Sequence, residues 1–112
     1  MAKRVVKDTA SQNLASAALS LRVVAQGQMR IAMATLHASA GITETVTLTI
    51  DQAEGSNYDV VLDSSGLNSE QDYIYKNAGS ELILNDGDAL TMACTNANTT
   101  GIVYGKIILV EN

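Results

Sequence analysis

The segment Asn85-Asp86-Gly87-Asp88 places three oxygen-bearing side chains around one glycine, between two short apolar runs. Carboxylate and amide oxygens are ligands for Ca²⁺, but the segment lacks the closing glutamate of an EF-hand loop. Its flanks are also strand-like, where an EF-hand needs helices. Asn, Asp and Gly tolerate positive φ and therefore favour turns. We predict a chain reversal between two strands; the alternative is a Ca²⁺ site with Asp86 and Asp88 as ligands.

The other reactive side chains are too few for a hydrolytic or metal centre. His37 is the only histidine and Cys94 the only cysteine. Cys94 falls on the inner face of a predicted strand, where a thiol behaves as a small, inert hydrophobe, so a Cys94–His37 dyad is disfavoured. Asp59 and Asp63 are about 13 Å apart along a strand. We therefore expect them to be solvated outward charges and not an acid–base pair.

The composition excludes several classes of protein. No glycine-rich phosphate loop, Gly-x-Ser-x-Gly elbow or CxxC pair occurs, and the chain contains no Phe and no Trp. Ligand pockets and base-stacking sites depend on aromatic side chains, and nucleic-acid binding needs a basic surface, whereas the net charge here is -5. No apolar run approaches the roughly 18 residues of a membrane helix. We expect a protein that is not an enzyme, holds no cofactor, and binds neither nucleic acid nor a membrane.

The charges are unevenly distributed along the chain. Lys3, Arg4 and Lys7 crowd the first seven residues, whereas residues 31 to 105 contain ten acidic residues and one basic residue, Lys76. A chain of 112 residues has the usual size of one domain. We predict a basic, extended N-terminal arm at residues 1–12 and a single β-domain at residues 13–112.

The spacing of turn residues and the apolar pattern indicate strands. Glycines recur at intervals of roughly 8 to 14 residues, close to the turn spacing of sandwiches and barrels. Between Thr43 and Ile50, four threonines share one face of a predicted strand, and Val46 and Leu48 lie on the other with Ile50.

A similar alternation at residues 57 to 63 predicts three inward side chains, Tyr58, Val60 and Leu62. About eight strands are expected, near residues 19–25, 28–37, 43–51, 57–63, 71–76, 80–85, 88–95 and 101–111. This number of short strands predicts an all-β fold, an antiparallel β-sandwich of the jelly-roll type.

Two of the predicted strands are apolar on both faces. In the last strand, one face carries Val103, Ile107 and Leu109, and the other carries Ile102, Tyr104, Ile108 and Val110. Residues 28 to 38 place Met29, Ile31 and Met33 on one side and Ala32, Ala34, Leu36 and Ala38 on the other. Because the outer side of a sandwich strand normally faces water, we expect the arm or another subunit to cover it. We therefore predict a homo-oligomer, a dimer or trimer, with contact residues Lys3, Arg4, Lys7, Ile102, Tyr104, Ile108 and Val110.

Two stretches resemble a type of small virion protein of tailed phages: MATLHASAGITETVTLTIDQAEGSNYDVVLDSS and ELILNDGDALTMACTNANTTGIVYGKIILVEN. Across residues 30 to 112, this pattern of strands and turns is similar to the staple or cement proteins that decorate capsids of epsilon-like short-tailed phages. The resemblance implies a jelly-roll-like domain that is made in the host cytoplasm and binds the major capsid protein on the capsid exterior. Our leading hypothesis is a capsid decoration protein that staples neighbouring subunits and stabilises the shell.

The alternative hypothesis is a phage tail or fibre head domain that binds a host receptor or glycan through its loops. Carbohydrate sites on jelly rolls usually use Trp or Tyr platforms, and the tyrosines here are Tyr58, Tyr73, Tyr75 and Tyr104. The candidate surface for this function is Asp72-Tyr73-Ile74-Tyr75-Lys76.

Overall fold

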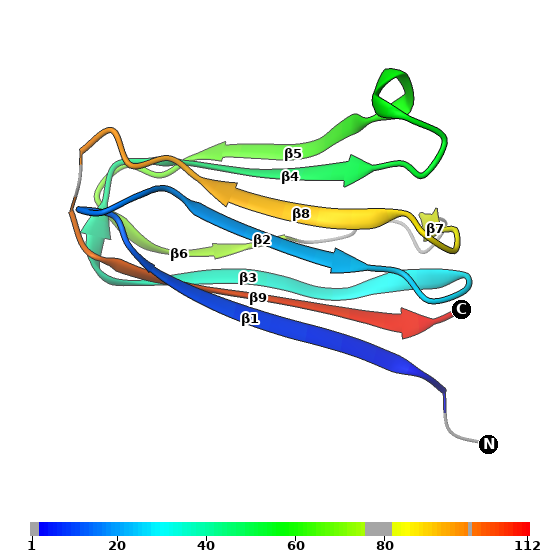
Figure 1. Cartoon of the computed structure of the whole chain (residues 1–112). Coiled ribbons are helices and arrows are strands. Elements are labelled where there is room, and N and C mark those ends of the chain that lie inside the picture. Colours follow the sequence, from blue (N-terminus) through cyan, green and yellow to red (C-terminus); the bar gives the residue numbers. More distant parts are fainter. Residues whose placement is uncertain (1–2, 76–81, 99) are drawn as a thin grey trace.

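The chain folds into two antiparallel sheets that pack face to face (Figure 1). The computed structural model describes residues 3–75, 82–98 and 100–112. Its elements are β1 Val5–Asn13, β2 Leu19–Val24, β3 Met29–Ile42, β4 Thr45–Asp51, the 3-10 helix η1 Ser56–Tyr58, β5 Val60–Gly66, β6 Glu70–Ile74, β7 Ile83–Leu84, β8 Ala89–Cys94 and β9 Ile102–Glu111. The described part of the chain contains no helix with the length and apolar character that a membrane span requires.

The strand order is that of a jelly roll. The first sheet has the order β1-β9-β3-β6, with the two-residue β7 also paired to β3, and the second sheet has the order β2-β8-β4-β5. The chain crosses from one sheet to the other at most of its connections, whereas β4 and β5 form a hairpin within the second sheet. The predicted all-β antiparallel sandwich is confirmed.

The core lies between the sheets and follows the strand period of two. In β2, Leu19, Leu21 and Val23 are buried while the residues between them are exposed. In β4, Val46 and Leu48 are buried in the same alternation. Alternate residues of a strand point to opposite faces, so each sheet contributes one apolar layer. The threonine-rich face of β4 is the outward face, as predicted.

The segment predicted to be a separate arm differs from that expectation. Residues 5 to 13 form β1, which pairs along its whole length with β9 as the edge strand of the first sheet. The Arg4 carbonyl accepts a 2.8 Å hydrogen bond from the Glu111 N–H, and the Leu14 N–H donates to the Gly101 carbonyl at 3.0 Å. Only Val6 and Ala10 of β1 pack against the core. An edge strand with so few buried positions leaves no regular apolar alternation in the sequence.

A β-bulge in β3 changes which side chains face the core. The register with β9 shifts between Ile31 and Met33, so that Ala32 is the extra residue. Ile31 is buried opposite Leu109, whereas Met33 lies opposite Ile108 on the outer side and is 41% exposed. The prediction that Met33 shares a face with Ile31 was therefore wrong. Beyond the bulge the apolar alternation continues on the inner side with Ala34, Leu36 and Ala38, all buried.

A second bulge, in β5, overturns the predicted orientation of residues 57 to 63. Leu48 pairs with Asp63 but Thr49 pairs with Val61, so Leu62 is the extra residue. Paired residues point to the same side, so Asp63 shares the inner side of its sheet with the buried Leu48 and is not an outward charge.

The inward prediction for Tyr58 was wrong, because this residue lies in η1 and is 60% exposed. Val60 pairs with the buried Ile50 on the inner side but is 50% exposed, and Leu62 packs against the core. Asp63 instead accepts a 2.6 Å hydrogen bond from the Tyr73 hydroxyl of β6. Burial, followed by this hydrogen bond, raises the pKa of Tyr73. The bond links the two sheets on the side of the sandwich formed by β5 and β6.

Gly105 lies at a close approach of the two sheets. A Cβ at this position of β9 would lie 3.2 Å from Leu19 Cδ2 and 3.2 Å from Met92 Sδ, both in the second sheet. We expect Gly105→Ala to destabilise the fold by about 1–2 kcal/mol, because a methyl group overpacks the interface between the sheets. Gly66→Ala is the matched control, since a Cβ there meets nothing within 4 Å. Urea denaturation of both variants tests this; equal stabilities would contradict the close packing.

Candidate interaction surface

The segment at residues 85 to 88 is a turn between β7 and β8, as predicted. Gly87 adopts a φ of 90°, and the Asp88 N–H donates to the Asn85 carbonyl at 3.0 Å. Asp88 is only 3% exposed. Its Oδ1 accepts from the Ala53 N–H and its Oδ2 from the Asn85 N–H, both at 2.9 Å. The buried carboxylate therefore joins its own turn to the loop that follows β4.

Asp86 ties the same turn to a third loop. Its Oδ1 accepts a 2.9 Å hydrogen bond from the Gly27 N–H, and the Gly87 N–H donates to the Ala25 carbonyl at 3.1 Å. Within residues 3–75, 82–98 and 100–112, no three His, Cys, Asp or Glu side chains are placed to share a metal ion. The acids of this turn serve as acceptors for backbone N–H groups, which is a structural role.

Cys94 lies in the core, whereas His37 lies on the outer side of the first sheet. Cys94 is fully buried on the inner side of β8, and burial, with a smaller effect of the Glu44 carboxylate, raises the pKa of its thiol to about 11. His37 lies on the outer side of the first sheet, opposite Tyr104, and its Nδ1 is 2.6 Å from Asp72 Oδ1. Both side chains of that pair are more than half exposed. The fold therefore separates the two residues that a Cys–His dyad would need.

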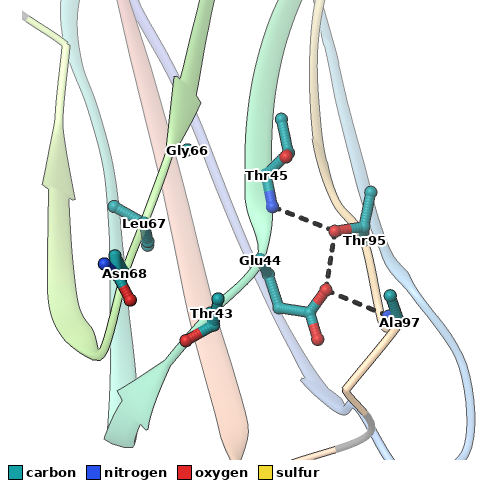
Figure 2. Close-up of a pocket in the computed structure, with 8 residues that line it drawn as sticks. All are labelled: Thr43, Glu44, Thr45, Gly66, Leu67, Asn68, Thr95 and Ala97. Carbon is teal, nitrogen blue, oxygen red and sulfur yellow. Dashed lines mark hydrogen bonds between the residues drawn. The ribbon is translucent and has the colours of Figure 1, made fainter.

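A recess of about 390 Å³ lies beside the start of β4 and contains a buried carboxylate, Glu44 (Figure 2). Glu44 is 4% exposed. Its Oε1 accepts from the Thr95 hydroxyl at 2.7 Å and from the Ala97 N–H at 3.0 Å, and its Oε2 accepts from the Asn98 N–H at 2.8 Å. The Thr95 hydroxyl also accepts from the Thr45 N–H at 2.9 Å. Glu44 thus fixes the loop that follows β8 to the beginning of β4.

These hydrogen bonds determine the charge state of Glu44. Burial by itself would raise the pKa of the carboxyl, but the bonds from Thr95, Ala97 and Asn98 act in the opposite direction, and the pKa lies below its ordinary value of 4.5. An ionised carboxylate that is already bonded through both oxygens has little capacity left for a ligand. Sequence analysis missed this role because the donors follow Glu44 by about fifty residues, although the strand alternation puts Glu44 on the inner side.

The outer face of the first sheet is the candidate interaction surface. Because directly paired residues point to the same side, the register places its side chains in rows across the strands. The rows are Val5–Val110–Arg30–Ile83, Lys7–Ile108–Met33, Thr9–Lys106–Thr35–Ile74, Ser11–Tyr104–His37–Asp72 and Asn13–Ile102. We refer to these residues together as the outer face.

Large exposed hydrophobic side chains are concentrated on the outer face. Six of those found among the described residues lie there: Val5, Met33, Ile74, Ile83, Ile102 and Tyr104, with exposed fractions from 38% to 60%. Ile108 and Val110 are half-buried between them. The outward side of the second sheet is different, with Thr45, Thr47, Thr49 and Thr91 along its two central strands. That side also exposes Val24 and Val61, but the larger group of exposed hydrophobic side chains lies on the outer face.

The outer face is also basic, although the protein as a whole is acidic. It carries Lys7, Arg30 and Lys106 and a single carboxylate, Asp72, which is paired with His37. The described residues contain no carboxylate within 4.0 Å of any of the three cations. The outer face therefore combines apolar side chains with positive charge that no acidic side chain of the described residues neutralises.

The structure brings most of the predicted contact residues together. Ile102, Tyr104, Ile108 and Val110 lie on one side of β9, and Lys7 lies opposite Ile108 on β1.

The other two predicted contact residues precede β1. Lys3 is exposed, and Arg4 is engaged within the chain. The Arg4 Nη1 donates to the Gln26 carbonyl and its N–H donates to the Glu111 carboxylate, each at 3.1 Å. Sequence reasoning did not group Val5, Met33, Ile83 and Arg30 with these contact residues, and it named Ile74 only in the alternative glycan surface, because the sequence does not show which strands are neighbours.

The surface suggested for glycan binding is only partly present. Tyr73 is buried and donates its hydroxyl to Asp63, and Tyr75 is half-buried. Lys76 lies outside the described residues. Asp72 and Ile74 belong to the outer face described above.

Comparisons with known proteins gave no relative. No protein-family model, no curated protein and no solved structure matches this chain.

Proposed function

We propose that this protein is a non-enzymatic structural protein that docks onto other protein subunits through the outer face of its first sheet. More specifically, we propose that it is a phage capsid decoration protein. As a small homo-oligomer, a dimer or trimer, it binds the major capsid protein across neighbouring subunits on the virion exterior and stabilises the shell. The resemblance of residues 30 to 112 to capsid staple and cement proteins supports this specific form.

The contrast between the two outer sides of the sandwich carries the proposal. A sheet side that faces water in an antiparallel sandwich is normally polar, as the threonine-rich side of the second sheet is. The outer face instead groups Met33, Ile102 and Tyr104 with other exposed apolar side chains. Contiguous apolar surface of this kind marks interaction sites on soluble proteins. An interface that covers it explains why these residue types occur there.

The dimensions of the outer face suit a stable protein interface. From a strand spacing of about 4.8 Å and a rise of about 3.3 Å per residue, the long strands β1, β9 and β3 with the short β6 beside them span roughly 19 Å, and the long strands extend about 30 Å. The relief of the side chains increases the accessible area above that of this flat rectangle. A typical specific interface uses about 800 Å² on each partner. The outer face, with its edges, supplies area of this order.

A charge placed on the outer face tests the proposal. We expect Met33→Glu to weaken binding to capsid shells lacking this protein at least tenfold, because an unpaired carboxylate would be buried in an apolar contact. Val24→Glu is the matched control: Val24 is 39% exposed, like Met33 at 41%, but lies on the outward side of the second sheet. Co-sedimentation with the shells measures both affinities. Equal binding by the two variants would contradict docking through the outer face.

A further inference from the structure

A recess of about 520 Å³ lies within the outer face, over β1, β9 and β3. Its floor is the row in which Gly105 pairs with Ala10 and Leu36, whose side chains point inward and leave the outer side bare. The side chains of Tyr104 and Lys106 stand at its two ends along β9. The neighbouring positions on β1 and β3 carry the smaller side chains of Thr9, Ser11 and Thr35. The space between the Tyr104 and Lys106 side chains therefore stays open.

The polar side chains of the recess are hydroxyl groups and one ammonium group, and all of them can donate hydrogen bonds. Thr9, Ser11 and Thr35 contribute hydroxyl groups, Tyr104 lies beside them, and Lys106 contributes an ammonium group on a half-buried stem. An ammonium group donates and cannot accept, whereas hydroxyl groups adapt to either role. No carboxylate lines the recess. Across the described ranges, the two ion pairs are Arg22–Asp51 and His37–Asp72, so Lys106 has no acidic neighbour at bonding distance.

We propose that this recess receives a carboxylate side chain, Asp or Glu, of the protein partner, an inference that rests on the docking function proposed above. A carboxylate bonded by Lys106 and neighbouring hydroxyls forms charge-assisted hydrogen bonds, which are stronger than neutral ones. Lys7 lies in the next row and adds positive potential at the rim of the recess. Ile102, Met33 and Ile108 surround the site with apolar side chains, which fits a protein surface better than a free anion.

The charge of the recess gives the contact specificity. A single acidic side chain in a partner interface fixes the register of docking, since an apolar face alone permits sliding. The rest of this protein is acidic, and its negative charges repel an acidic partner surface. Docking through surfaces other than the outer face is therefore disfavoured.

The test is an NMR titration of the isolated, ¹⁵N-labelled protein with the peptide acetyl-Gly-Glu-Gly-Glu-Gly-amide. We expect saturable amide shifts at Thr9, Ser11, Thr35 and residues 104 to 106, and no such shifts with the matched Gln peptide. We expect Lys106→Gln to weaken binding of the Glu peptide about tenfold. Lys7→Gln, a cation of the same face outside the recess, should weaken it less than about threefold.

Three results would overturn the inference. The Gln peptide could shift the same amides equally, Lys106→Gln could leave the affinity unchanged, or the shifts could lie on another surface. A titration with inorganic phosphate completes the test, because tighter binding of phosphate than of the Glu peptide would assign the recess to a different ligand.

The outcomes separate this inference from the docking function. If Met33→Glu abolishes shell binding while the recess does not distinguish the Glu and Gln peptides, docking stands and the carboxylate site fails. If the Glu peptide binds the recess but Met33→Glu binds shells normally, the carboxylate site stands and docking through the outer face fails.

Discussion

Replacing Glu44 by alanine is expected to destabilise the protein by about 2–4 kcal/mol. The substitution leaves the Thr95 hydroxyl and the backbone N–H groups of Ala97 and Asn98 without their acceptor. A buried donor without a partner costs about 1–3 kcal/mol, and water that enters the recess will satisfy part of this group. Urea denaturation measures the loss. Glu54→Ala removes an exposed carboxylate from a loop and is expected to change the stability by less than about 0.5 kcal/mol.

The contribution of Glu44 also depends on pH. Its folded-state pKa lies below the ordinary value of 4.5, so its ionised form stabilises the fold above that pH. This stabilisation is lost as the pH falls through the lower, folded-state value, where the carboxyl becomes protonated in both states. The difference in unfolding free energy between the wild type and Glu44→Ala should therefore be constant above about pH 5.5 and shrink below pH 4.5. A difference that grows towards acid pH would contradict the ionised, hydrogen-bonded Glu44.

Asp88→Ala is expected to cost about 2–3 kcal/mol. Both carboxylate oxygens of this buried residue accept backbone N–H groups, from Ala53 and from Asn85, and alanine supplies no replacement. Asp86→Ala loses one acceptor at an exposed site, on the Gly27 N–H, and should cost less than about 1 kcal/mol. Chemical denaturation of the two variants gives the comparison. Equal costs would show that the burial of Asp88 does not determine its role.

The same turn decides the calcium alternative. Because the carboxylates of Asp86 and Asp88 already accept backbone N–H groups, we expect millimolar CaCl₂ to leave the melting temperature of the wild type unchanged. A ligand that binds only the folded state raises the melting temperature as its concentration exceeds its dissociation constant. A Ca²⁺-dependent increase that disappears in Asp86→Ala would establish a calcium site and overturn the structural interpretation of the turn.

Regular alternation made much of the fold predictable. The threonine face of β4, the two-sided apolar pattern of β9 and the turn at residues 85 to 88 are each visible in a few consecutive residues. The eight expected strands correspond to β2 to β9, although β7 contains only two residues. The jelly-roll order needs β1 as its first member, and that strand was missed because an edge strand with two core contacts has no apolar period.

The features that were predicted wrongly or missed have a common physical cause: each depends on contacts between residues that are distant in sequence. A bulge shifts every later side chain to the other face, and nothing in the residues around Ala32 or Leu62 marks the extra position. The alternation from Thr43 to Ile50 puts Glu44 on the inner side with Val46, but the donors that satisfy its carboxylate are brought to it only by the fold. The contact residues predicted on β9 were identified from one strand, whereas the outer face exists only when five strands are aligned.

The central claim is that the outer face of the first sheet is covered in the assembled state, and hydroxyl-radical footprinting tests it most directly. Met33 and Tyr104 are exposed on the outer face, Tyr58 is exposed on η1, and Met29 and Met92 are fully buried. Oxidation of the isolated protein and of the native particle, followed by mass spectrometry, compares all five in one experiment. We predict that assembly protects Met33 and Tyr104 several-fold, while the buried methionines stay unreactive and Tyr58 stays reactive. Equal oxidation of Met33 and Tyr104 in the free and assembled protein would contradict the claim.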